Sequence, residues 1–195
     1  SKDRGIYKTT DGGNNWEKIL YIDENTGAID LVMHPENPDL IYAATWQRIR
    51  KKWNDPRNEE GYRGSGIWKT TDAGKNWKQV NNGLPEAGFR GRIGLDIARS
   101  NPQVLYAFVD NYEITRDAYG EEEDSYGRPK GGVIRGATVY RTDNSADSWY
   151  KVSGLTEETA AYMESHSATY GWVFGQIRVD PSDENTIYTM GLGLH

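Results

Sequence analysis

The 195-residue sequence predicts an all-β fold: a β-propeller segment of about three four-stranded antiparallel blades. Three observations support this fold. A short turn motif recurs along the chain, a two-strand pattern recurs between its copies, and the composition suits strands joined by tight turns. The chain holds 22 Gly, 7 Trp and 13 Tyr but only 3 Phe. Tyr and Trp suit sheets in which one end of the side chain is packed and the other is wet.

The turn motif occurs in two close copies and one divergent copy. Residues 5–16 (GIYKTTDGGNNW) match residues 66–77 (GIWKTTDAGKNW) in order. Residues 139–149 (VYRTDNSADSW) resemble both, and we align Asp143 with Asp11 and Asp72, which leaves one extra residue before Trp149. Self-similarity at this scale predicts a repeat architecture.

A hairpin pattern alternates with the turn motif. Apolar residues recur at every second position over 29–33, 93–97 and 177–179, and each run is followed by a Pro/Asn turn and a second β-rich run. With the hairpin strands named A and B, and the strands flanking the turn motif named C and D, the chain reads CD, ABCD, ABCD, AB. A β-sandwich is the alternative, but it does not require the same turn between the same strand pairs. The single segment 1–195 therefore divides into blade pieces 5–20, 27–80, 91–153 and 175–191.

The turn motif predicts a structural role for its aspartates. An Asp side chain can accept hydrogen bonds from backbone N–H groups a few residues on, Gly allows the positive φ such turns need, and Trp can cover the turn. A calcium site over residues 143–147 lacks the spacing and the closing Glu, so we expect neither metal nor cofactor. The predicted structural residues are Thr9, Asp11, Gly13, Trp16, Thr70, Asp72, Gly74, Trp77, Asp143 and Trp149.

The motif resembles the Asp-box, or BNR repeat, of sialidases, sortilin-type receptors and xyloglucanase-like glycoside hydrolases. The wider sequence is similar to large bacterial proteins described as BNR-repeat glycosyl hydrolases or sortilin-like, through residues 43–48 (AATWQR), 82–85 (NGLP), 91–95 (GRIGL) and 176–181 (QIRVDP). The resemblance implies a propeller but does not fix an activity, because the motif lies on the structural side of propellers with many functions.

Antiparallel strand order predicts which end of the blades binds. The A–B and C–D loops share one end and are short, whereas the B–C and D–A loops share the other end and include the long segments 47–65, 111–136 and 154–174. Long loops on a rigid scaffold commonly carry binding residues. Aromatic side chains beside charged ones can stack on sugars or hold a peptide. The candidate ligand-binding residues are Trp53, Tyr62, Arg63, Tyr112, Tyr119, His166, Tyr170 and Trp172.

Composition argues against several partners. The net charge of −6 disfavours nucleic acid, and no apolar run approaches the ~20 residues of a spanning helix, so we expect no membrane insertion. The absence of Cys excludes disulfides and thiolate zinc sites. The resemblance implies an extracellular or periplasmic location, with any export signal upstream of this segment.

Two functions remain open at this point. The sequence favours a binding or scaffold module of a larger secreted bacterial-type protein that recognises carbohydrate or peptide. The alternative is part of a xyloglucanase-like glycoside hydrolase, which needs two carboxylates about 5–10 Å apart. No motif assigns such an Asp/Glu pair, and the resemblance places the two carboxylates on separate propellers, so no catalytic residue is named.

The strand count predicts a partner. Three blades do not close a propeller, since propellers use about four to eight. We expect the missing blades to come from the remainder of a longer chain, with association of two copies into a six-bladed ring as the alternative.

Overall fold

The computed structural model describes residues 1–48, 64–120, 123, 132–160, 162 and 175–190. Nearly all regular structure in these residues is β; the exceptions are a short 3-10 helix, η2, and a helical turn at residues 157–160. The elements in chain order are β1 (Ile6–Lys8), β2 (Glu17–Leu20), β3 (Thr26–Met33), β4 (Ile41–Gln47), β5 (Gly66–Thr70), β6 (Lys78–Gln79), η2 (Ala87–Phe89), β7 (Arg90–Ile97), β8 (Leu105–Arg116), β9 (Val133–Thr142), β10 (Tyr150–Lys151), β11 (Gln176–Asp180) and β12 (Asp183–Met190).

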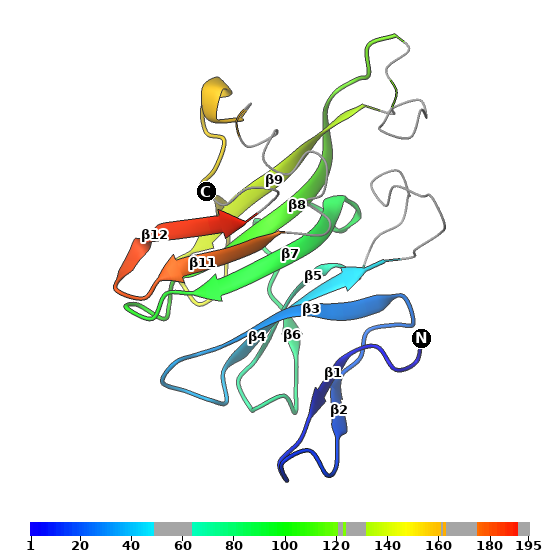
Figure 1. The fold of residues 1–195 in the computed structure, drawn as a ribbon, viewed down its shortest axis with the longest axis vertical. Helices are drawn as coiled ribbons and strands as arrows, with labels where there is room; N and C mark the ends of the chain where they lie inside the picture. The colour runs from blue at the N-terminus through cyan, green and yellow to red at the C-terminus, as the bar shows by residue number, and fades with distance from the viewer. Residues whose placement is uncertain (49–63, 121–122, 124–131, 161, 163–174, 191–195) are drawn as a thin grey trace.

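The strands form four antiparallel sheets in series along the chain (Figure 1). Two sheets have four strands, in the orders β3-β4-β5-β6 and β7-β8-β9-β10, and they are flanked by the two-stranded sheets β1-β2 and β11-β12. The predicted all-β fold with four-stranded antiparallel units is confirmed. The observed order is the expected CD, ABCD, ABCD, AB.

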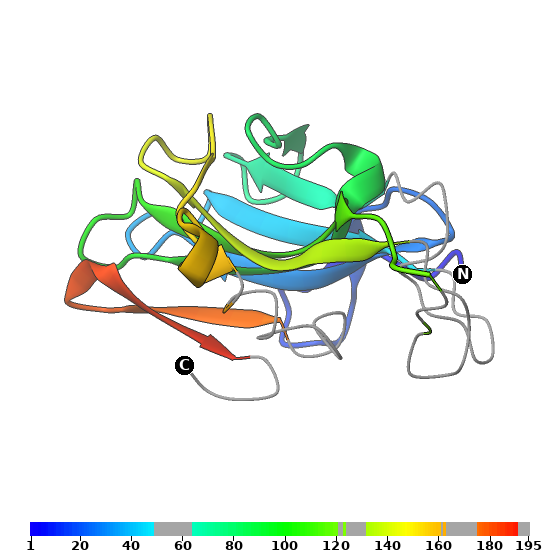
Figure 2. The same ribbon diagram turned by 90° about the horizontal axis from the view of Figure 1, so that it is seen from above.

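The first strands of successive sheets lie next to one another. β7 packs between β3 and β11 (Figure 1), and Figure 2 shows the same ribbon from above. Side-chain carboxylates join these strands: the Leu95 backbone N–H donates to Asp30 Oδ2 (2.9 Å), and the Val179 N–H donates to Asp96 Oδ2 (2.8 Å). These two bonds tie the last three sheets to one another through their first strands, β3, β7 and β11.

The core consists of the layers between sheets. One layer lies between the two four-stranded sheets and includes Ile67, Val80, Leu95 and Trp149. A second layer lies between β7–β10 and β11–β12 and is built around residues such as Phe108. Successive sheets therefore bury their faces against each other.

The two ends of the sheets differ in their connections. The A–B hairpins and the turns over 9–16, 70–77 and 142–149 lie at one end, which we call the turn end; the A–B hairpins project to the left in Figure 1. The opposite end, where β5 and β9 begin and β4 and β8 finish, we call the loop end. These ends correspond to the predicted short-loop and long-loop ends.

One predicted loop is shorter than expected. β8 and β9 stay paired beyond Asn111 through Ile114–Ile134 and Arg116–Val133, whereas β7 pairs with β8 only as far as Asn111. β8 and β9 therefore project past the sheet as a two-stranded ribbon, residues 113–116 with 133–135 (Figure 1). The sequence predicted a single loop over 111–136. In the structure, residues at both ends of this segment continue the β8–β9 ladder.

Candidate functional site

The second turn shows how the motif folds. Thr70 Oγ1 accepts the backbone N–H of Gly74 (3.0 Å) and donates to Asp72 Oδ1 (2.7 Å). Asp72 in turn accepts the backbone N–H of Asn76 at Oδ1 (2.8 Å) and its side-chain amide at Oδ2 (2.7 Å). The side chains of the motif thus satisfy the backbone donors that the turn removes from the β ladder.

The first turn repeats these contacts and has the same electrostatics. Thr9 accepts the Gly13 N–H (2.9 Å), and Asp11 accepts the Asn15 backbone N–H (2.9 Å). Hydrogen bonds lower the pKa of Asp11 to about 2, chiefly the one from the Asn15 backbone, and lower that of Asp72 to about 2, chiefly the one from the Asn76 side chain. Both carboxylates are ionised acceptors committed to their own turns, which does not suit a proton-donating role.

The third turn corrects the predicted alignment. Thr142 Oγ1 accepts the Ala146 N–H (3.1 Å) and donates to Asn144 Oδ1 (2.7 Å), and Asn144 accepts the Ser148 N–H (3.0 Å). Asn144 thus occupies the position of Asp11 and Asp72, Asp143 does not, and no extra residue precedes the Trp. The alignment on Asp failed because Asn replaces the Asp and Ala replaces the second Gly.

The third turn keeps its backbone without glycine. Ser145 and Ala146 have φ of 57° and 69°, where the first turn has Gly12 and Gly13 at 72° and 99°. These are left-handed conformations that cost an L-residue about 1–2 kcal/mol each. The Thr hydroxyl and the side-chain oxygen two residues later occur in all three turns. The Gly residues and the negative charge do not, so the turn depends less on them.

The tryptophans of the turns differ in environment. Trp16 is 60% exposed and Trp149 only 4%. The indole N–H groups of Trp16 and Trp77 donate to carbonyls of their own turns, at Gly13 (3.1 Å) and Gly74 (3.1 Å). Trp149 donates instead to Val80 O of the preceding sheet (2.8 Å). The third Trp is thus an inter-sheet anchor rather than a cover for its own turn.

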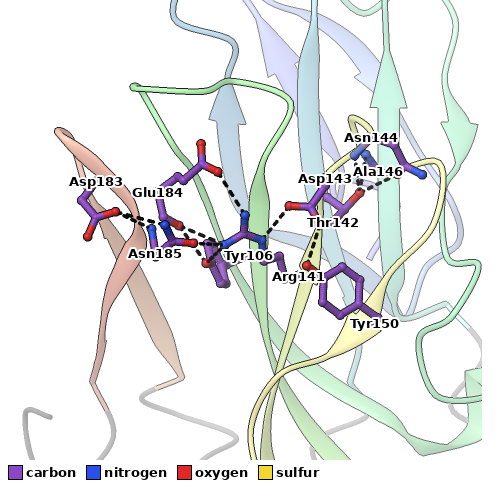
Figure 3. Close-up of polar contacts among 10 residues, drawn as sticks. All are labelled: Tyr106, Arg141, Thr142, Asp143, Asn144, Ala146, Tyr150, Asp183, Glu184 and Asn185. Carbon is purple, nitrogen blue, oxygen red and sulfur yellow. Dashed lines mark hydrogen bonds and ion pairs between the residues drawn. The ribbon is translucent and has the colours of Figure 1, made fainter.

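Asp143 lies in a polar cluster instead (Figure 3). Its two oxygens contact Arg141 Nε (2.7 Å) and the Tyr150 hydroxyl (2.5 Å). Burial would raise the pKa of Asp143, but the hydrogen bonds from Tyr150 and Arg141 outweigh it and the pKa is lowered. Burial and the bond to this carboxylate raise the pKa of Tyr150.

The same guanidinium reaches the last hairpin. Arg141 donates to the Tyr106 hydroxyl (2.7 Å), to Asn185 Oδ1 (2.8 Å) and to Glu184 Oε1 (3.2 Å), and Tyr106 donates to Glu184 O (2.8 Å) (Figure 3). Burial would lower the pKa of Arg141, but its hydrogen bonds to Asp143 and Tyr106 raise it. The cluster holds an ionised arginine between two carboxylates and fixes the β11–β12 hairpin to the preceding sheet.

A cavity of about 290 Å³ opens at the turn end between the second and third turns. Two of its charged groups are engaged within the segment, since Lys69 donates to Ser145 O (2.8 Å) and Asp72 is held within its own turn. A ligand would have to compete with these hydrogen bonds for both groups. The lining residues are Lys69, Thr71, Asp72, Asn76, Trp77, Lys78, Val80 and Asp147.

At the loop end, two arginines lie near the start of β7. Arg90 is 7% exposed, and it donates from Nε to Ser65 O (2.9 Å) and from a terminal nitrogen to Pro85 O (2.6 Å). Burial lowers the pKa of Arg90 and of half-buried Arg92, and Asp30 partly offsets this for Arg92. Arg90 therefore ties the start of β7 to Ser65, the residue that precedes β5.

The extended ribbon presents the exposed groups of the loop end. Ile114 is 56% and Tyr119 71% exposed, and the Arg116 guanidinium lies 4.4 Å from the centre of the Tyr119 ring. On the same ribbon Glu113 accepts from Arg135 Nε (3.0 Å). An aromatic face beside an arginine and an ion pair is the combination expected of a surface that stacks on a ligand and hydrogen-bonds to it.

The structure describes two of the predicted ligand-binding residues. Tyr119 lies on the segment that follows β8 and is exposed as expected, whereas Tyr112 lies within β8 and is only 5% exposed, because the ladder continues there. The sequence interpretation missed Ile114 and Arg135. The period-2 pattern of β8 and β9 continues into the ribbon and could have indicated both residues. The remaining candidates lie outside the described residues: Trp53, Tyr62, Arg63, His166, Tyr170 and Trp172.

Two features are absent from the residues that the structure describes. Among those residues, no group of three or more His, Asp or Glu side chains is placed to hold a metal ion. Likewise, none of the helices in the described ranges has the length and apolar character needed to cross a membrane.

Comparison with solved structures identifies the architecture. The whole chain superposes on the GH74 xyloglucanase from Xanthomonas campestris with a TM-score of 0.59 at 17% identity, covering 24% of that chain. It matches an ancestral GH74 enzyme (TM-score 0.57, 16% identity, 95% of this chain and 19% of that one) and the Niastella koreensis GH74 enzyme (0.56, 18%, 96% and 24%). The chain is a β-propeller segment. At these identities the likeness shows the fold alone.

Sequence comparison finds a distant similarity. Over 137 residues, 70% of this chain, the propeller segment is 27% identical to vacuolar protein sorting/targeting protein 10 of Colletotrichum graminicola. That match spans 8% of the relative's length. No model of a known protein family matches the chain. The segment thus corresponds to a small part of the proteins it resembles.

Proposed function

We propose that this propeller segment is a binding module that recognises a carbohydrate or a peptide through its loop end. The observation that carries the proposal is the exposed surface beyond the edge of β7, where Ile114 lies with Arg116 and the Glu113–Arg135 pair on the ribbon and Tyr119 lies on the segment that follows β8. Paired strands hold Ile114, Arg116 and the Glu113–Arg135 pair, so a ligand would meet a partly preformed surface.

The turn end supports this assignment by contrast. The carboxylates of Asp11 and Asp72 and the guanidinium of Arg141 already have partners within the segment. A ligand at that end would have to replace existing hydrogen bonds, which costs more than contacting an exposed aromatic face. We further propose that the segment belongs to a larger protein exported to the periplasm or the cell exterior, with further blades or a second copy as partner.

A binding screen tests this function. The chain would be applied to immobilised glycans, including xyloglucan oligosaccharides, and to a peptide array. Any ligand found should lose affinity on Tyr119→Ala and Ile114→Ala. Tyr150→Ala is the matched control, because Tyr150 is 46% exposed but lies at the turn end. Equal losses for Tyr119→Ala and Tyr150→Ala in folded protein would contradict the proposal.

A second candidate is part of a glycoside hydrolase acting on a polysaccharide. It is supported by the fold shared with a GH74 xyloglucanase. Hydrolysis needs a general acid and a second carboxylate across the scissile bond. Incubation of the chain with xyloglucan, followed by measurement of new reducing ends, tests it. Release of reducing ends that is lost on Asp/Glu→Asn/Gln substitution at the loop end would favour this function over binding alone.

A further inference from the structure

The ribbon leaves the sheet β7-β8-β9-β10 through a β-bulge in β8. Asn111 pairs with Gly136, and the next paired residues are Ile114 and Ile134, so three steps along β8 match two along β9. A further register shift follows between Ile114 and Arg116. An extra residue of this kind bends the strand and re-aims the side chains beyond it. The direction of the ribbon is therefore set at the bulge that begins at Asn111 (Figure 1).

A buried amide closes the bulge. Asn111 is 0% exposed and is the last residue of β8 that pairs with β7. Its side chain spans the extra residue, because Oδ1 accepts the backbone N–H of Glu113 (2.9 Å) and Nδ2 donates to Glu113 Oε2 (3.1 Å). A buried amide that lost these partners would be left unsatisfied at a considerable cost, so the bulge has one strongly preferred geometry.

Glu113 carries this constraint to Arg135 on the facing strand. The same carboxylate oxygen, Oε2, accepts from Arg135 Nε (3.0 Å). The guanidinium is planar, with one donor at Nε and two at each terminal nitrogen, so the bond at Nε fixes the plane of the whole group. Among the described residues, neither terminal nitrogen of Arg135 has a hydrogen-bond acceptor, and the side chain is 39% exposed. The fork of terminal nitrogens is thus oriented but not engaged.

The charge beside this fork is positive. Lys151 of β10 lies near Arg135 and donates to Gly154 O (3.1 Å). Burial, and then the charge of Arg135, lowers the pKa of Lys151. A ligand group that approaches the terminal nitrogens therefore meets hydrogen-bond donors and two cations balanced by the one carboxylate of Glu113. The complementary group carries two neighbouring oxygen acceptors, the geometry that an arginine fork matches.

From these contacts we propose that Arg135 binds the ligand of the loop end through its two terminal nitrogens, and that Asn111 is a positioning residue that holds Arg135 in place through Glu113. The ligand role of Arg135 rests on the binding function proposed above. The positioning by Asn111 does not, because it is a property of the free chain and can be measured without a ligand.

Hydrogen exchange in the free chain tests the positioning. The Arg135 Nε–H signal would be followed by NMR in the unmodified, Asn111→Ala and Thr138→Val chains. Asn111→Ala should quicken its exchange about tenfold, the factor that corresponds to one hydrogen bond. Thr138→Val is the matched control, because Thr138 is 1% exposed and its hydroxyl donates to Gly136 O (3.2 Å) and not to Glu113. Equal exchange in Asn111→Ala and the unmodified chain would overturn the positioning role.

Glu113→Ala tests the same link from the other side. The Glu113 side chain is 36% exposed, so its removal should not prevent folding. Exchange of the Asn111 side-chain amide and of Arg135 Nε–H should both quicken. Unchanged exchange of the Asn111 amide would overturn the link, even if the Asn111→Ala chain did not fold.

Affinity tests the ligand role, with xyloglucan oligosaccharides and the peptides of the array as probes and the folded fraction matched. Arg135→Lys keeps the charge but loses the planar fork, so binding should weaken about tenfold. Arg99→Lys is the matched control, because Arg99 is exposed between β7 and β8 at the turn end. Normal binding by Arg135→Lys would overturn the ligand role.

A double-mutant cycle separates positioning from general damage. Asn111→Ala should weaken binding of the same probe in the chain that has Arg135, but not in an Arg135→Ala chain, because Asn111 acts through Arg135. Losses that add would overturn the proposal. Failure of all probes to bind the unmodified chain would overturn the ligand role together with the function proposed above, whereas the exchange measurements would still decide the positioning of Arg135.

Discussion

The two ends of this propeller segment differ in the residues they use and in the exposure of those residues. At the turn end, Thr, Asp and Arg side chains are bonded to nearby backbone or to the next sheet, as in the Arg141 cluster. At the loop end, Ile114 on the ribbon of β8 and β9 and Tyr119 on the segment that follows β8 are exposed. The contrast is one of exposure: the turn end commits its polar side chains to the fold, and the loop end presents large side chains on its surface.

The third turn provides the largest expected effect. Trp149→Ala removes a 4% exposed indole that packs between the sheets and bonds to Val80 O, so unfolding should become easier by about 3–5 kcal/mol. Trp77→Ala should cost clearly less, because Trp77 is only half-buried and bonds to its own turn. Urea denaturation of both variants measures the difference. Equal losses would contradict the inter-sheet role of Trp149.

A smaller effect is expected from the hydroxyl that organises the same turn. Thr142→Val keeps the shape but leaves the buried Ala146 N–H without its acceptor, which should cost about 1–3 kcal/mol. Ser148→Ala is the control, since its exposed hydroxyl only accepts from the Asn144 amide and its loss should stay within about 0.5 kcal/mol. Thermal unfolding of both variants measures the two losses. A larger loss for Ser148→Ala than for Thr142→Val would mean that the Asn144 amide, not the Thr142 hydroxyl, organises the turn.

Lowering the pH should weaken the first two turns but not the third, which has Asn144 in place of the Asp. The pKa values of Asp11 and Asp72 lie near 2 in the folded chain, against an ordinary 3.8, so their contribution is complete above pH 3.8 and is lost as pH falls through about 2. Converting both to Asn reproduces the neutral side chain of Asn144. The melting temperature of Asp11→Asn/Asp72→Asn should therefore fall less between pH 4 and pH 2 than that of the unmodified chain. An unchanged acid response would show that these carboxylates do not couple to folding.

The smallest effect on stability is expected at the loop end. Tyr119 is 71% exposed and lies beyond the sheets, so Tyr119→Ala should change the free energy of unfolding by no more than about 0.5 kcal/mol. Chemical denaturation checks this value. A loss above about 1 kcal/mol would mean that the ribbon is a structural element rather than a platform.

The sequence predicted the strand order because turn chemistry and period-2 alternation are local properties. Thr9, Asp11, Thr70 and Asp72 bond within four residues, so their turns could be recognised without tertiary information. The third turn was misaligned because Asn144 supplies the same oxygen as Asp, and a pattern of residue types does not show which atoms bond.

Long-range contacts explain what the sequence did not predict. The role of Asp143 depends on Arg141 and on Glu184, 43 residues from that arginine. The burial of Tyr112 depends on how far β9 continues to pair with β8. Neither can be inferred from neighbouring residues, because each is set by which strands pack together. Tyr119, which the sequence placed in an exposed connection, needed only local information.

The most direct test compares affinities at the two ends. The dissociation constant of the tightest-binding glycan or peptide would be measured for the unmodified chain, for Tyr119→Ala and for Asp72→Asn, with the folded fraction matched. Loss of a stacking ring should weaken binding by about tenfold in Tyr119→Ala, and Asp72→Asn should bind like the unmodified chain. The opposite result, with binding lost in Asp72→Asn and retained in Tyr119→Ala, would contradict the assignment of structure to the turn end and recognition to the loop end.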